Sequence, residues 1–99
     1  MATQSTADEA YFDRNQVALA FGRLALKLGW RVGLGIDPSE PEWPVLYVDT
    51  PAGQVSWHLP SAEVASANWP AYPGAWDGHT VEEKRERLAR LVAMAVDEL

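Results

Sequence analysis

Two histidines and their neighbouring carboxylates are the residues of this chain best suited to chemistry. His58 ends a run of alternating residues, and Asp77 and His79 stand two apart in the stretch Trp76-Asp77-Gly78-His79. An imidazole beside a carboxylate can hold a metal ion through nitrogen and oxygen atoms. It can also act as the base in hydrolysis while the acid orients it. The candidate small-ligand or metal site therefore consists of His58, Tyr72, Asp77 and His79.

The same residues also have a structural interpretation. Asp77 and His79 can satisfy the amides of a turn and a helix start, while His58 is a polar residue of a strand. No His-Glu-x-x-His motif, nucleophile elbow or phosphate-binding loop occurs in the sequence. Ser56 precedes His58 by two positions, and such side chains on a strand stand about 6–7 Å apart, which argues against a direct hydrogen bond. The sequence favours a protein without enzymatic activity and predicts no cofactor.

The stretch that holds Asp77 and His79 has the composition of a turn that leads into a helix. Gly78 can adopt the positive φ that a tight turn requires. Thr80 and Glu83 have the spacing of a capping box, in which each side chain binds the backbone amide of the other residue. The apolar spacing that follows predicts a helix over residues 81–98. Its predicted apolar face consists of Val81, Leu88, Leu91, Val92, Ala95 and Leu99.

Another long helix is predicted over residues 7–28. Apolar residues recur there at helical spacing, and Gly29 follows as a C-terminal stop. Residues 1–6 are predicted to be disordered, and residues 7–99 to form a single domain with one core. The predicted core-facing residues of this helix are Val17, Ala20, Phe21, Leu24 and Leu28.

Three segments between the helices have the pattern of strands. Residues 30–37 alternate, and one side is nearly bare because it holds Gly33 and Gly35. Another backbone, a flat ligand or a covering aromatic ring can approach that side closely. Residues 45–49 and 54–59 form a predicted hairpin whose turn is rich in proline and glycine.

Burial predicts the register of the hairpin. If Val48 faces Val55 and Leu46 faces Trp57, the apolar side chains share one face, whereas a shift by one residue would mix the faces. The fold class that follows is α+β, with a three-stranded antiparallel sheet and two long helices packed on one face. The opposite face then carries Tyr47, Asp49, Gln54, Ser56 and His58.

Two further segments link these elements. Residues 38–44 are rich in proline and acidic residues, which predicts a connection rather than helix interior or central strand. Residues 60–68 are predicted to form a short helix with Ser61 as its cap.

The charge distribution indicates the class of partner. The net charge is −6, and no Lys or Arg occurs between Val32 and Glu83. Nucleic-acid backbones are bound through clustered Lys and Arg, so direct nucleic-acid binding is disfavoured. A basic protein surface, such as that of a nuclease or another nucleic-acid-binding protein, is the predicted partner. The residues predicted to bind it are Asp37, Glu40, Glu42, Trp43 and Asp49.

Other features of the sequence indicate the cellular compartment and the mode of association. No apolar stretch approaches the roughly 20 residues needed to span a bilayer, and the first residues do not resemble a secretory signal. The absence of cysteine excludes disulfides and thiolate metal sites and fits a reducing cytoplasm. A homodimer joined through the outer sheet face is an alternative mode of association.

Two motifs in the second half of the chain support a resemblance. They are Pro51-x-Gly53-Gln54-Val55-Ser56-Trp57-His58 and Tyr72-Pro73-Gly74-x-Trp76-Asp77-Gly78-His79-Thr80-x-Glu82-Glu83-Lys84. Over about residues 45–91 the chain resembles a group of small proteins encoded by bacteriophages and prophages. The resemblance carries no assigned chemistry, but it implies a phage accessory protein in the cytoplasm of a bacterial host. By analogy with anti-CRISPR proteins, such a protein would bind and inhibit a host defence or nucleic-acid-binding machine.

Overall fold

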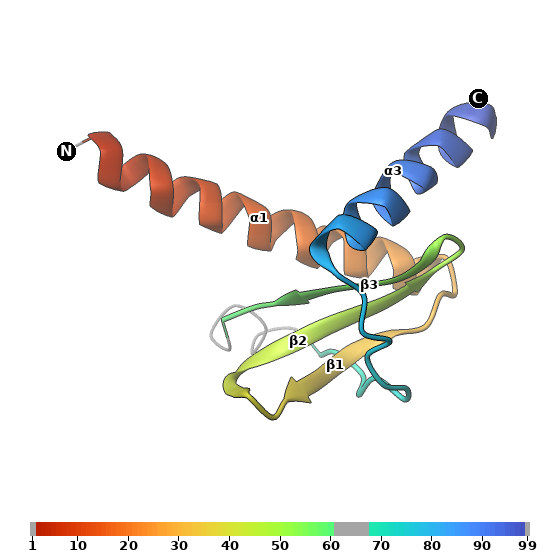
Figure 1. Ribbon diagram of the computed structural model, residues 1–99, viewed down its shortest axis with the longest axis horizontal. Helices are drawn as coiled ribbons and strands as arrows, with labels where there is room; N and C mark the ends of the chain where they lie inside the picture. The colour runs from red at the N-terminus through yellow and green to blue at the C-terminus, as the bar shows by residue number, and fades with distance from the viewer. Residues whose placement is uncertain (1, 61–67, 99) are drawn as a thin grey trace.

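A computed structural model describes residues 2–60 and 68–98 of the chain and confirms the α+β class. The three strands form one antiparallel sheet in the order β1-β2-β3, with the two helices on one side of it (Figure 1). Most of the predicted helix over residues 60–68 lies outside the described residues. The elements are α1 (Ala2–Lys27), β1 (Val32–Asp37), β2 (Glu40–Thr50), β3 (Gly53–His58) and α3 (Val81–Glu98).

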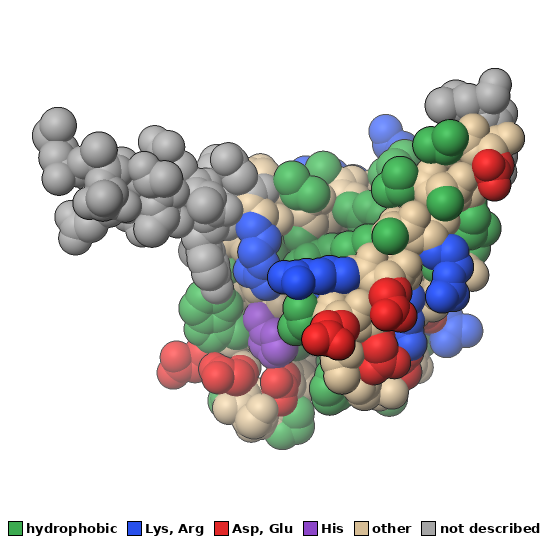
Figure 2. Space-filling view, turned by 45° about the horizontal axis from the view of Figure 1, so that its top comes forward, with side chains coloured by type: hydrophobic (Ala, Val, Ile, Leu, Met, Phe, Trp, Pro, Cys, Tyr) green, Lys and Arg blue, Asp and Glu red, His purple; other side chains and the backbone are tan. Residues whose placement is uncertain are grey.

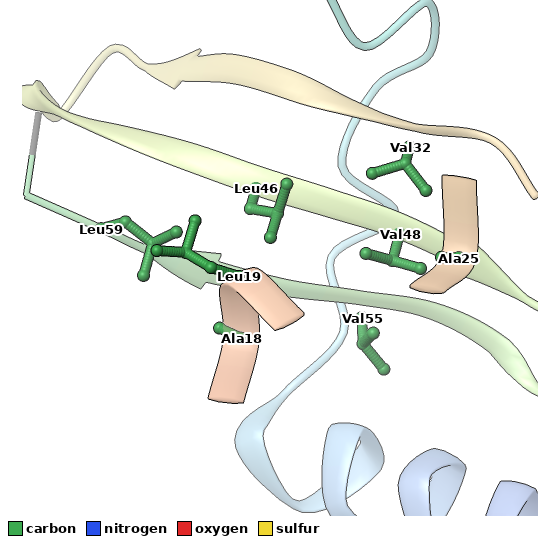
Figure 3. Packing of buried hydrophobic residues seen from close by; sticks show 8 residues of the cluster. All are labelled: Ala18, Leu19, Ala25, Val32, Leu46, Val48, Val55 and Leu59. Atoms are coloured by element: carbon green, nitrogen blue, oxygen red, sulfur yellow. The ribbon is translucent and has the colours of Figure 1, made fainter. Parts of the chain in front are cut away.

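The predicted register of the hairpin is confirmed. Val48 pairs with Val55, and Leu46 pairs with Trp57. Gly53 has a φ of 125° in the turn, as the predicted left-handed position requires. The apolar face of the sheet meets small and branched residues of α1 in a single core (Figure 3). That core contains Ala18, Leu19, Ala25, Val32, Leu46, Val48, Val55 and Leu59.

The face of α1 that meets the sheet differs from the predicted one. Ala18, Gly22 and Ala25 are buried against the strands. They allow a close approach, because a Cβ at Gly22 would lie 3.0 Å from the Trp69 ring and 3.1 Å from Leu46. The helix also begins at Ala2 rather than at residue 7. The predicted core residues Val17, Leu24 and Leu28 are instead 67%, 53% and 54% exposed, and Ala20 is exposed too.

Helix α3 contacts the sheet mainly through its N-terminal half. Its bounds are those predicted, and Leu88 packs against the core. The predicted apolar face is wrong for Val81, Val92 and Ala95, which are exposed. The helices diverge in Figure 1, and Figure 2 shows hydrophobic side chains uncovered on them. The radius of gyration, 14.3 Å, accordingly exceeds the roughly 13 Å of a compact domain of this length.

Strand β2 starts earlier than predicted. The prediction that residues 38–44 only connect two strands is wrong, because β2 begins at Glu40 and Pro44 pairs with Ile36. This end of β2 extends beyond its last pairing with β3, between Val45 and His58. Proline is tolerated there because it lies at the end of the ladder with β3, where the Leu59 amide still donates to the Pro44 carbonyl at 2.9 Å.

The chain itself covers the bare outer face of β1. The amide of Tyr72 donates to the Leu34 carbonyl at 3.0 Å, and a Cβ at Gly33 would lie 2.4 Å from that amide nitrogen. The Tyr47 ring lies against Gly35 and stacks on the Tyr72 ring with centroids 4.7 Å apart. A backbone and an aromatic ring therefore both make the close approaches that the glycines permit.

Candidate functional site

The segment before α3 passes from the outer face of the sheet around the edge formed by β3. Gln54 holds this segment with three hydrogen bonds. Its side-chain nitrogen donates to the Ala75 carbonyl and the Tyr72 hydroxyl, both at 2.9 Å, and its side-chain oxygen accepts from the Asp77 amide at 3.0 Å. Gln54 is itself buried. One amide side chain thus fixes the position of the turn relative to β3.

The turn ends in the predicted capping box. Gly78 has a φ of 84°, which a side chain would strain. The Thr80 amide donates to the Glu83 carboxylate, and the Glu83 amide donates to the Thr80 hydroxyl, each at 3.1 Å. The start of α3 is therefore fixed by local sequence.

Two cations of α3 satisfy carbonyl groups on the free edge of β3. Lys84 donates to the Ser56 carbonyl at 3.0 Å, and Arg87 donates to the Gln54 carbonyl at 2.7 Å. The Lys84 ammonium also lies 5.3 Å from the centre of the Trp57 ring. Burial lowers the pKa of Lys84, with Arg14 and Arg85 adding a smaller repulsion. These contacts block an edge that would otherwise be open to another strand.

The central feature of the site is a chain of hydrogen bonds through Ser56, His79 and Asp77. The Ser56 hydroxyl lies 3.1 Å from Nε2 of His79, and Nδ1 of His79 lies 2.7 Å from Oδ1 of Asp77. A carboxylate can only accept, so Nδ1 carries a proton, and in the tautomer protonated on Nδ1 alone Nε2 accepts from the serine hydroxyl. The His79 side chain is 3% exposed.

The Asp77 carboxylate is held on both sides. Its Oδ1 also accepts from the His79 amide at 3.0 Å, and its Oδ2 accepts from Arg87 at 2.8 Å. Burial raises the pKa of Asp77, but the hydrogen bonds from His79 and Arg87 outweigh it and leave the pKa below its usual value. Asp77 therefore remains ionised and keeps the His79 proton on Nδ1.

The Ser56 side chain faces a hollow of about 600 Å³ on the outer face of the sheet. A second imidazole–carboxylate pair lies in the wall, where Nε2 of His58 donates to Asp37 at 3.0 Å. Hydrogen bonds from Ser39 first, and from His58, lower the pKa of Asp37 to about 2. The residues around the hollow are Gly35, Ile36, Asp37, Pro38, Ser39, Val45, Tyr47, Ser56, His58, Tyr72, Gly74, Ala75 and Trp76.

The five residues predicted to bind a basic partner differ from one another in exposure and in their contacts within the chain. Asp49 accepts from the Tyr72 hydroxyl at 2.7 Å and lies 3.5 Å from Arg31. Asp37 is engaged by Ser39 and His58, as described above. Of the five predicted residues, Glu40 and Glu42 are exposed and Trp43 is half-buried.

The four residues of the predicted ligand or metal site lie around the hollow or behind it. His58 and Tyr72 are in its wall, whereas Asp77 and His79 lie behind Ser56. Among the described residues, no three His, Asp or Glu side chains are placed to share a metal ion. Sequence reasoning paired Ser56 only with His58 and missed its bond to His79. The one available signal was that Gln54 and Ser56 belong to the predicted polar face.

A family model supports the importance of this turn. The WDGH domain model matches residues 2–91. The chain belongs to the WDGH domain family. The four letters of that name occur in the chain as Trp76-Asp77-Gly78-His79, and the matched range includes α1 and β1, which the two sequence motifs left out. No curated protein and no solved structure matches the chain.

Each residue of the WDGH motif has a distinct contact. Asp77 and His79 continue the hydrogen-bond chain from Ser56, and Gly78 supplies the positive φ between them. Trp76 lies in the wall of the hollow, with its ring edge-on to His79 at 5.8 Å between centroids. The motif thus joins the hollow to the helix start. Elsewhere in this WDGH domain, no described helix combines the length and apolarity needed to cross a membrane.

Proposed function

We propose that this WDGH domain binds a small ring-containing molecule in the hollow on the outer face of its sheet. The observation that carries the proposal is that two polar side chains of β3, Ser56 and His58, face one concave space and are each held by a different partner, His79 and Asp37. A volume of about 600 Å³ lies within the range of small-molecule sites. The contacts of Gln54 and Asp77 fix the wall before any ligand arrives, which reduces the entropy cost of binding.

The lining favours a flat, neutral or cationic ligand. Tyr47, Tyr72 and Trp76 contribute aromatic rings to the hollow, and the Trp76 residue is 56% exposed. Aromatic rings favour stacked or edge-on contact with another ring. The Ser56 hydroxyl and the His58 ring can orient polar substituents. Asp37 and the net charge of −6 disfavour an anion.

The test is a titration of the full ¹⁵N-labelled chain with benzamide, benzamidine and adenosine, followed by amide chemical shifts. We expect saturable shifts confined to the residues around the hollow, and weaker shifts with benzoate. Trp76→Ala should weaken binding about tenfold, because a stacking surface is lost. Val92→Ala, at another exposed apolar position, is the matched control and should bind normally. This proposal would be refuted if none of the probes caused localised shifts. It would also be refuted if Trp76→Ala bound them as tightly as the unmodified chain does.

A second proposal concerns the acidic end of the β1–β2 hairpin. Glu40 and Glu42 are exposed there, and Ile36 beside them is 71% exposed. Figure 2 shows acidic side chains grouped near a histidine at one end of the visible face. Charge complementarity supports a basic protein surface as partner, as for an anti-CRISPR-like phage protein acting on nucleic-acid-binding machinery in the bacterial cytoplasm.

Capture from a host lysate tests this second proposal. Glu40→Lys with Glu42→Lys should abolish capture of a basic partner, whereas Glu82→Lys with Glu86→Lys, on exposed positions of α3, should retain it. If the hairpin variant still captures the same partner, the acidic end of the hairpin is not the binding surface.

A further inference from the structure

We infer that Ser56 is a nucleophile that attacks small carboxylic esters held in the hollow. This inference rests on the proposed binding function, because the ester must occupy the hollow in which the Ser56 hydroxyl lies. It adds a reaction and a substrate class to that function.

The geometry of three side chains supports the inference. Nε2 of His79 accepts the Ser56 proton across 3.1 Å, and Asp77 holds the opposite ring nitrogen at 2.7 Å. This is the arrangement of nucleophile, base and orienting acid used in acyl transfer. The imidazole side chain is 3% exposed, and before reaction the Ser56 hydroxyl occupies Nε2. Arg87 fixes the acid in turn.

The Ser56 hydroxyl is one of several links between β3 and the turn. Lys84 binds the Ser56 carbonyl rather than its hydroxyl, and Gln54 and Arg87 link the turn to β3 through other atoms. The hydroxyl can therefore be removed while these contacts remain. Replacing Ser56 by alanine therefore tests the nucleophile while these other contacts still hold the turn.

A second serine in the same hollow provides an internal comparison. The Ser39 hydroxyl donates to the Asp37 carboxylate at 2.7 Å. With a pKa of about 2, that carboxylate is a weak base and withdraws little of the serine proton. Ser39 therefore has the same access to a ligand but lacks an imidazole partner. Ser56 should be the reactive serine of the two.

The reactants are an aryl ester and water. The Ser56 Oγ attacks the carbonyl carbon as its proton passes to Nε2 of His79. The bond from that carbon to the aryl oxygen breaks, and the His79 proton goes to the departing oxygen to give a phenol. Water then attacks the acyl-serine, giving its proton to His79, and the acid leaves as the proton returns to Ser56 Oγ. Tyr47, Tyr72 and Trp76 surround the aryl ring.

The experiment exposes the full chain to an alkyl fluorophosphonate and follows intact mass and peptide maps. Attack by Ser56 Oγ forms a P–O bond and expels fluoride. We expect one adduct per chain at Ser56, no adduct with Ser56→Ala, and normal labelling of the control Val92→Ala, whose side chain lies on α3 outside the hollow. Asp77→Asn should slow labelling at least about 100-fold, since it removes the ionised positioning residue. The chemical-shift changes that benzamide causes should be the same in Asp77→Asn as in the unmodified chain. If Asp77 only held the wall of the hollow in place, its replacement would weaken benzamide binding as well as labelling.

The outcomes separate this inference from the function on which it rests. Saturable benzamide binding without any Ser56 adduct overturns the nucleophile and leaves the binding site standing. An adduct that forms equally fast in Asp77→Asn, or that forms on Ser39, also overturns it. Absence of both binding and adduct overturns both proposals. A Ser56 adduct without saturable binding refutes the ligand-binding proposal and, with it, the claim that the ester is held in the hollow, although Ser56 itself is then shown to be reactive.

Discussion

Replacing Gly33 by alanine should detach the segment that builds the wall of the hollow. A Cβ at Gly33 would lie 2.4 Å from the Tyr72 amide nitrogen and 2.6 Å from the Tyr72 Cα. These are backbone atoms, so the clash cannot be relieved by turning a side chain. The segment must move away from β1, which breaks the hydrogen bonds from Leu34 to Pro70 at 2.9 Å and from Tyr72 to Leu34 at 3.0 Å.

The expected loss of stability follows from these contacts. Two backbone hydrogen bonds contribute about 1 kcal/mol each, and the stack of Tyr72 on Tyr47 about 1 kcal/mol. Without the clash, alanine in a strand would be more stable than glycine by roughly 0.5–1 kcal/mol. The net expectation for Gly33→Ala is a loss of about 2 kcal/mol in the free energy of unfolding. The sign of the effect is thus decided by the close approach.

Urea denaturation followed by circular dichroism measures the effect. If the free energy of unfolding falls by about 2 kcal/mol per M of urea, the midpoint of the transition should fall by about 1 M. Gly35→Ala is the comparison, because its Cβ would meet the Tyr47 ring at 2.7 Å rather than a backbone. A ring can shift, so its loss should be smaller. A midpoint for Gly33→Ala equal to or above that of the unmodified chain would show that the segment does not pack against Gly33 as closely as described.

Three other predictions concern the turn and α3. Thr80→Ala removes the cap shared with Glu83 and should cost about 1 kcal/mol by urea denaturation, so an unchanged midpoint would contradict the capping role. Arg87→Met leaves the Gln54 carbonyl and Asp77 without their cation and should cost about 1–3 kcal/mol, and equal stability would show that water replaces it. Because the folded pKa of Asp77 lies below the ordinary 3.8, its contribution is present above that pH and is lost as the pH falls through the folded value. The stability gap between the unmodified chain and Asp77→Asn should therefore narrow below about pH 3.8, and a constant gap in urea midpoints would contradict this.

The sequence alone determined the features that depend on neighbouring residues or on strand alternation. The capping box of Thr80 and Glu83 forms as predicted, because its two residues are three positions apart on one turn. Gly29, Gly53 and Gly78 all have positive φ, as the predicted helix stop and turns require. The hairpin register follows from alternation, since a shift by one residue would expose half of the apolar side chains.

Tertiary packing sets which side of α1 faces the sheet and which residues meet at the site. Apolar residues lie on more than one side of α1, and the small ones allow the closest approach. Ser56 and His79 are 23 positions apart, and their hydrogen bond depends on the path of the chain around the edge of β3. Gln54, Lys84 and Arg87 fix that path through contacts that no local spacing specifies. A hydrogen bond between residues far apart in the sequence depends on how whole helices and strands pack. The sequence therefore indicated which residues are polar, but it could not predict which of them would be bonded to each other.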